Sequence, residues 1–129
     1  MPELQVTCIS AAVIAVAVVA LAVAVSLRRG KVGVTIGVQD DERLHRLVRA
    51  HGNLVEFAPL ALILMGLLEY GQGPQRMLWI MAGMLLSGRL LHAVGMLAGV
   101  TPLRALGMVL THATLITGAI GVILYCRPA

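Results

Sequence analysis

The chain has 129 residues, of which 59% are hydrophobic and 12% are charged. A water-soluble domain carries about 45–50% apolar and about 25% charged residues, so these few charges cannot cover a soluble globule this apolar. Aromatic residues make up only 3% of the chain, and because base stacking needs aromatic side chains, the net charge of +4 does not indicate nucleic acid as a partner. We therefore expect a membrane protein.

The first apolar segment covers residues 4–27 without a charge. A helix of about 20 apolar residues crosses the roughly 30 Å hydrocarbon core of a bilayer, so this segment is long enough. A cleavable signal peptide has a basic start and a shorter apolar run. Here Glu3 stands near the start, and Arg28 and Arg29 follow the run. We expect a retained span over about residues 5–27.

Three further apolar segments predict spans over about residues 50–70, 76–97 and 103–125. The Gly-Gln-Gly-Pro sequence at residues 71–74 is a turn signal between the second and third spans. Between the third and fourth, Thr101 is expected to cap a helix that has Pro102 at its first position. Short turns favour antiparallel neighbours. The sequence thus predicts an all-α protein, with residues 1–129 forming a single four-transmembrane-helix antiparallel bundle.

The first connection is longer than the others and is followed by Asp40, Asp41 and Glu42. Negative charge is favourable at a helix start, so we expect the second helix to begin near Asp41 and to continue to about Tyr70.

Basic residues in short loops indicate how the bundle is oriented. Two basic residues, Arg76 and Arg127, belong to the side of the termini. Seven belong to the first and third connections and the adjoining helix starts: Arg28, Arg29, Lys31, Arg43, Arg46, Arg49 and Arg104. This asymmetry predicts that both termini lie outside and that the first and third connections lie in the cytoplasm.

Polar side chains recur on one face of the second helix, at spacings of 4, 3, 4 and 3 positions: Glu42, Arg46, Arg49, Asn53 and Glu56. Because an intramembrane charge is costly unless paired or hydrated, this face is expected to meet other helices or a wet cavity. In one interpretation Arg49 pairs with Glu56 and Asn53 bridges helices. In the other, the face binds a zwitterionic ligand, with Arg for a carboxylate and Glu for an ammonium.

The third span adds Arg89 and His92 at positions i and i+3. These two side chains contribute another inward cation and a hydrogen-bonding ring. Positive charge then exceeds negative charge in the interior, which favours an anionic partner.

The run RAHGNLVEF at residues 49–57 resembles the R-A-x-x-N-x-x-E-[FY] pattern of the MAPEG family, the membrane-associated proteins of eicosanoid and glutathione metabolism. Four spans, a long first connection and GRLLH at residues 88–92 extend the resemblance over most of the chain. It implies a homotrimer that holds glutathione in a charged cleft between adjacent subunits, open to the cytoplasm. The length looks most like the small bacterial members, which implies a bacterial inner membrane.

The resemblance also implies roles for particular residues. Arg104 matches a basic residue at the start of the fourth helix, where an arginine stabilises the glutathione thiolate in characterised members. Met96 lies where eicosanoid-processing members carry tyrosine, and Phe57 stands where several members have Tyr. The residues that match glutathione-binding positions are Arg28, Arg29, Arg49, Asn53, Glu56, Arg89 and His92.

Together these features predict a glutathione-dependent membrane enzyme with a lipophilic second substrate. It would conjugate glutathione to electrophiles or reduce lipid hydroperoxides, with glutathione as co-substrate. The four histidines have no metal-ligand spacing, so no metal is expected. Two alternatives use the same polar stripe: a small transporter-like protein with Glu56 as a proton-linked carboxylate, and a trimeric membrane protein without catalysis.

Overall fold

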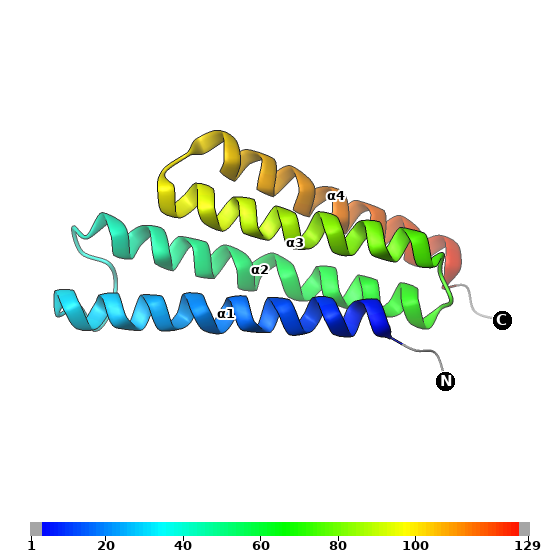
Figure 1. Cartoon of the computed structure of the whole chain (residues 1–129), viewed down its shortest axis with the longest axis horizontal. Coiled ribbons are helices and arrows are strands. Elements are labelled where there is room, and N and C mark those ends of the chain that lie inside the picture. Colours follow the sequence, from blue (N-terminus) through cyan, green and yellow to red (C-terminus); the bar gives the residue numbers. More distant parts are fainter. Residues whose placement is uncertain (1–3, 127–129) are drawn as a thin grey trace.

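The computed structural model describes residues 4–126, and four helices lie within them. They are α1 (Gln5–Val32), α2 (Glu42–Tyr70), α3 (Gln75–Ala98) and α4 (Thr101–Tyr125) (Figure 1). Each helix is long and apolar enough to cross a membrane. The predicted all-α, four-helix membrane bundle is therefore confirmed. Glu3 and Arg127, which entered the predictions of the first span and of the orientation, lie outside the described residues.

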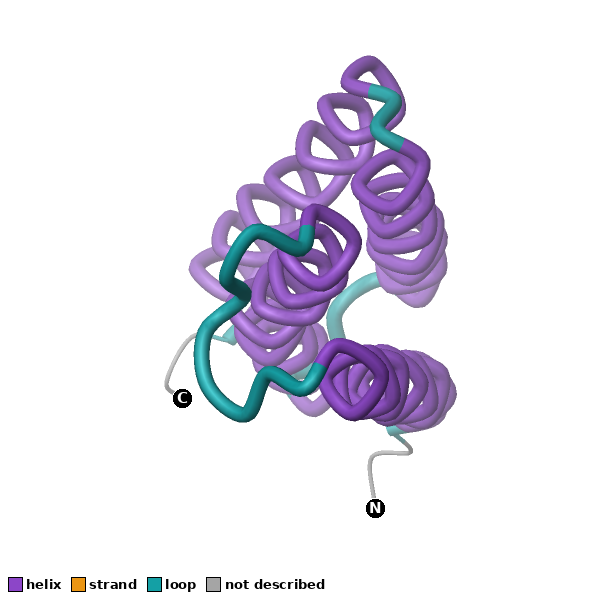
Figure 2. Tube along the Cα trace, turned by 90° about the vertical axis from the view of Figure 1, so that its left-hand side faces the viewer, coloured by secondary structure: helices purple, strands orange, loops and turns teal. Residues whose placement is uncertain are grey.

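Consecutive helices run antiparallel. α1 lies beside α2, α3 packs on α2, and α4 packs on α3 (Figure 1). The connections at residues 33–41 and 99–100 share one end of the bundle, which we call the loop end, while α1 begins and α4 ends at the opposite, terminal end. Figure 2 looks along the bundle from the loop end, where the long first connection crosses from α1 to α2.

The first connection is fixed at both of its helix junctions. α1 ends at Gly33, whose left-handed φ of 69° suits a residue without a Cβ. Asp41 caps α2 by accepting a hydrogen bond from the Leu44 N–H at 2.6 Å, and it also accepts one from Arg28 Nε at 3.1 Å. The hydrogen bonds from Arg28 and from the Leu44 amide lower the pKa of the Asp41 carboxyl. The predicted extent of the second helix, from near Asp41 to Tyr70, is confirmed.

The start of α4 differs from the prediction. Thr101 is the first residue of the helix, and Val100 precedes it as the capping position without a side-chain hydrogen bond. The prediction that Thr101 caps this helix is therefore wrong. The chain becomes helical one residue earlier than expected, because the Val100 carbonyl already accepts the Arg104 N–H, at 3.3 Å. Pro102 is tolerated in this first turn, where its missing N–H has no intrahelical partner in any case.

The larger apolar core lies toward the terminal end. Val6 of α1, Met65 and Leu68 of α2, and Leu78 and Met81 of α3 are fully buried together there. Burial inside this one chain is low in α1. A smaller apolar core of Ile14, Leu54 and Ala58 lies nearer the middle of the bundle.

A buried carboxylate ties α1 to the end of α2. Glu69 is 4% exposed, and its two oxygens accept the backbone N–H groups of Val6 and Thr7, each at 2.9 Å. The first turn of α1 leaves N–H groups without intrahelical acceptors, and its own capping residue, Leu4, supplies none. A carboxylate at a helix N-terminus also interacts favourably with the helix dipole.

Candidate functional site

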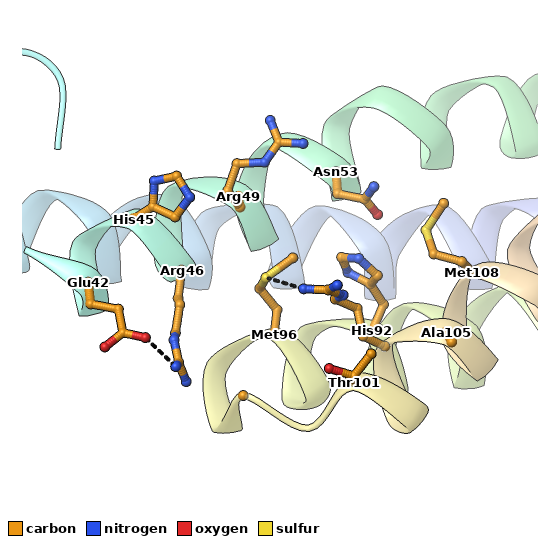
Figure 3. A pocket seen from close by; sticks show the side chains of 12 residues that line it. Glu42, His45, Arg46, Arg49, Asn53, His92, Met96, Thr101, Ala105 and Met108 are labelled. Carbon is orange, nitrogen blue, oxygen red and sulfur yellow. Dashed lines mark hydrogen bonds and ion pairs between the residues drawn. The ribbon is translucent and has the colours of Figure 1, made fainter.

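A cleft of about 720 Å³ opens at the loop end between α2 and the facing ends of α3 and α4 (Figure 3). His45 and Arg49 lie on the α2 side, and Met96 and Thr101 lie opposite. The cleft is lined by Glu42, His45, Arg46, Arg49, Asn53, His92, Met96, Gly99, Thr101, Arg104, Ala105 and Met108. Four of the predicted site residues, Arg49, Asn53, His92 and Arg104, are thus brought together from three helices.

The charges of the cleft do not cancel. Arg46 forms an ion pair with Glu42, one helical turn away. Glu42 is the only carboxylate among the lining residues. Arg49 and Arg104 have no ion-pair partner within residues 4–126. Two exposed arginines without an ion-pair partner therefore line this cavity, and its excess positive charge favours an anionic ligand.

The interpretation in which the polar stripe satisfies itself is met only in part. Arg49 does not pair with Glu56 in the described part of the chain, so within the stripe only Arg46 and Glu42 neutralise each other. Asn53 does bridge two helices, because its side-chain oxygen accepts a hydrogen bond from Arg89 Nη1 at 2.6 Å. The same nitrogen contacts the Asn53 main-chain oxygen at 3.2 Å.

Arg89 lies behind the cleft and does not line it. It is 6% exposed, and within the described chain no carboxylate pairs with it. Its charge is stabilised by Asn53, by the Met108 sulfur at 3.7 Å, and by the Phe57 ring, whose centroid lies 5.9 Å from Cζ. Because Arg89 holds the Asn53 oxygen, the Asn53 amide nitrogen is left to donate into the cleft. Arg89 therefore acts as a positioning residue for Asn53.

Close contact between the α3 and α4 backbones places His92 beside Arg104. A Cβ built on Gly107 would lie 2.5 Å from the His92 amide nitrogen and 2.6 Å from the Gly88 carbonyl oxygen. A Cβ on Gly95 would lie 2.5 Å from the Arg104 amide nitrogen. Glycine at these positions allows the two helices to meet backbone to backbone.

Arg104 is exposed at the mouth of the cleft, where its Nη1 contacts the Met96 sulfur at 4.0 Å. The contact is long for a hydrogen bond. It places the Arg104 guanidinium beside the Met96 side chain at the cleft.

Three predicted site residues lie away from the cleft of this single chain. Arg28 binds the carboxylate of Asp41. Arg29 donates to the main-chain oxygens at positions 35 and 37 of the first connection. Glu56 is exposed on α2 and, among the described residues, has no ion pair.

The start of α4 contributes lining residues beyond the predicted Arg104. Thr101, Arg104, Ala105 and Met108 follow one another at helical spacing, so they share one face of the first two turns. The spacing itself signals a shared helix face, whereas Thr101 was expected only to cap the helix. No group of three or more metal-ligating side chains comes together in residues 4–126.

Four membrane-spanning helices with a cationic cleft at one end define an integral, multi-pass membrane protein of the four-helix class. The family model described as MAPEG family matches residues 6–124. The chain therefore belongs to the MAPEG family, whose members include glutathione-dependent transferases and related enzymes. Comparison with curated proteins and with solved structures finds no match.

Proposed function

We propose that this protein is a glutathione-dependent membrane enzyme that conjugates glutathione to lipophilic electrophiles or reduces lipid hydroperoxides. The observation that carries the proposal is the cleft in which Arg49 and Arg104 face open space without an acidic partner. Glutathione has two carboxylates, one ammonium and a thiol, so it bears a net negative charge that this cleft suits. The proposed ligands within one chain are Arg49, Asn53, His92 and Arg104.

The chemistry assigned to Arg104 follows from the acidity of thiols. A free thiol has a pKa of about 8.5, and a nearby guanidinium favours its thiolate form. In conjugation, the thiolate attacks the electrophilic carbon and forms a carbon–sulfur bond, while a leaving group departs with its bonding electrons or, at an activated double bond, the displaced electron pair takes up a proton from water. In peroxide reduction, the thiolate attacks the peroxide oxygen and the O–O bond breaks, so that with one proton from water the products are an alcohol and a sulfenic acid. A second glutathione thiol then converts the sulfenic acid to glutathione disulfide and water.

A second cavity supports a lipophilic co-substrate. An apolar groove of about 450 Å³ lies between α1, α2 and α3, lined by residues such as Ala17, Ala20 and Leu86. His92 lines both this groove and the cationic cleft. We assign the groove to the hydrocarbon part of the second substrate, which would reach it from the bilayer, with His92 separating it from glutathione.

Assembly into a homotrimer is part of the proposal. An ionised carboxylate on the lipid-facing side of a span is unfavourable by several kcal/mol, and Glu56 is exposed on α2 of the single chain. We assign Glu56 to a subunit boundary where it completes the glutathione site. Arg28 and Arg29 are engaged within their own chain, by Asp41 and by the main chain of the first connection. The excess of basic residues at the loop end supports an orientation in which the cleft faces the cytoplasm of a bacterial cell.

Calorimetric titration of glutathione into the purified protein tests the proposal. Arg49→Ala and Glu56→Gln should each weaken binding about thirtyfold or more, because truncating one partner of a desolvated, hydrogen-bonded charge pair costs about 2–5 kcal/mol. Arg76→Ala removes one positive charge from an exposed position at the terminal end and serves as the matched control. Equal binding by the wild type and all three variants would refute the assignment.

The ultraviolet absorbance of bound glutathione, titrated against added protein, tests the activation step separately. Wild-type protein should bring out the thiolate signal at neutral pH, while Arg104→Ala should bind glutathione without it. If the two proteins give the same thiolate absorbance, Arg104 does not have the proposed role.

A further inference from the structure

A second group of cations gathers at the loop end, away from the cleft. A notch of about 210 Å³ between α1 and α2 is lined by Ala24, Leu27, Arg28, Lys31, Arg43 and Leu47. We call it the basic notch. None of these residues lines the cationic cleft, so the basic notch is a separate feature of the molecule.

The basic notch lies at the level where hydrocarbon gives way to headgroups. The charge-free part of α1 ends at Leu27, and Arg28 and Lys31 follow within the next turn. Leu27 is 63% exposed, so it offers an apolar surface directly below the cations. Leu47 of α2, which is buried, closes the notch from the other wall.

Its charges are only partly balanced. Arg28 forms an ion pair with Asp41. The Asp41 carboxylate also lies near enough to Arg43 to be stabilised by its charge. Neither Lys31 nor Arg43 has an ion-pair partner in the described residues. Three cations and one carboxylate leave the basic notch with a net charge of +2.

The adjoining loop supports contact with a lipid surface. Arg29 donates to the main-chain oxygens of Thr35 and Gly37 and thereby fixes the tip of the first connection against α1. Ile36, between those two residues, is 88% exposed, more than any other large apolar side chain described. An apolar side chain held outward beside a basic pocket is typical of a segment that enters the interfacial region of a bilayer.

We propose that the basic notch binds the headgroup phosphate of an anionic phospholipid, with one acyl chain lying along the exposed Leu27. Phosphate oxygens accept hydrogen bonds from ammonium and guanidinium groups, and basic pockets between spans at the cytoplasmic side suit anionic headgroups. A zwitterionic lipid brings its own ammonium group, which the net positive charge of the notch disfavours. This inference does not depend on glutathione binding.

Native mass spectrometry of the full-length protein, released from micelles of an uncharged detergent, tests the proposal. The protein is titrated with phosphatidylglycerol or with phosphatidylcholine, and lipid-bound species are counted. Wild-type protein should retain phosphatidylglycerol preferentially. Lys31→Gln and Arg43→Gln should each weaken that retention about fivefold, the effect of one cation near an anionic surface, and Arg43→Lys should restore most of it.

The matched control is Arg76→Gln, which removes the same charge from an exposed site at the terminal end and should change retention less than twofold. Circular dichroism establishes that each variant folds. Equal losses in Arg76→Gln and Arg43→Gln, or equal retention of both lipids by the wild type, would overturn the proposal. Displacement of phosphatidylglycerol by millimolar inorganic phosphate would also overturn it, by making the notch a site for free phosphate.

Discussion

Replacing Arg89 with Gln should separate ligand binding from stability. The substitution removes a guanidinium that is 6% exposed and donates to Asn53. Losing a hydrogen bond to a charged group costs about 1.5–3 kcal/mol. Removing a cation from the centre of a span recovers about 2.5–3.5 kcal/mol. Because these terms oppose each other and are similar in size, we expect the free energy of unfolding to change by less than about 2 kcal/mol.

Glutathione binding should nevertheless weaken. Without Arg89, the side-chain amide of Asn53 rotates freely and no longer presents its nitrogen to the cleft. The loss of one oriented hydrogen bond is worth about 0.5–1.5 kcal/mol, which corresponds to roughly two- to tenfold in the dissociation constant. Arg89→Lys keeps the charge but lacks the planar fork whose two terminal nitrogens contact Asn53 and the Met108 sulfur, so it should weaken binding nearly as much.

Calorimetry with glutathione and denaturant-induced unfolding in detergent provide the two measurements. If Arg89 supplied only long-range charge, Arg89→Lys would bind like the wild type and Arg89→Gln would not. A loss of more than about 4 kcal/mol of stability in Arg89→Gln, with unchanged glutathione affinity, would show that Arg89 is purely structural and would refute the positioning role.

Three further predictions concern other parts of the bundle. Glu69→Ala should lower the free energy of unfolding by about 1–3 kcal/mol, because two N–H groups at the start of α1 lose their acceptor. Chemical denaturation measures this change, and an unchanged denaturation midpoint would contradict the prediction. The lowered pKa of the Asp41 carboxyl contributes stability that is present above its ordinary pKa and is lost as the pH falls through its folded value. The melting temperature of the wild type should therefore drop below about pH 4. The drop should be smaller in Asp41→Asn, which keeps a capping oxygen but has no carboxyl to protonate. Ala20→Phe should fill the apolar groove and raise the KM for long-chain electrophiles several-fold, while the KM for short ones stays unchanged. Val19→Phe, at the neighbouring exposed position, is the control and should change neither KM value. Equal effects of the two variants would exclude the groove as a substrate site.

Helical periodicity predicted the common face of the α2 polar stripe correctly as far as Asn53. Residues at spacings of 4 and 3 average 3.5 per turn, whereas a straight helix has 3.6, so such a row drifts about 20° per heptad. From Glu42 to Glu56 the row covers two heptads and rotates by about 40°. Arg49 and Asn53 still face the cleft, but Glu56 lies deeper along the helix and on its exposed surface. The sequence pattern had placed all of them on one face.

The contacts made by Arg89 and Glu69 could not be derived from local sequence. Arg89 meets Asn53 across 36 positions, and Glu69 meets Val6 across 63. Each contact depends on how far one helix is shifted along its neighbour, and that register is set by side-chain packing over the whole interface. For Arg89, the sequence showed only that the charge was too costly to leave facing lipid.

The position of Arg104 illustrates how packing decides chemistry in this bundle. The residue lies in the first turn of α4, a place that basic residues reach in many membrane proteins simply as interfacial anchors. Gly95 and Gly107 bring the α3 and α4 backbones together, so this turn lies against α3, and Arg104 meets Met96 at the cleft. A larger residue at Gly107 would push α4 away from His92, and the guanidinium would move with it. The glycines therefore determine whether this arginine serves the proposed site or only the membrane surface.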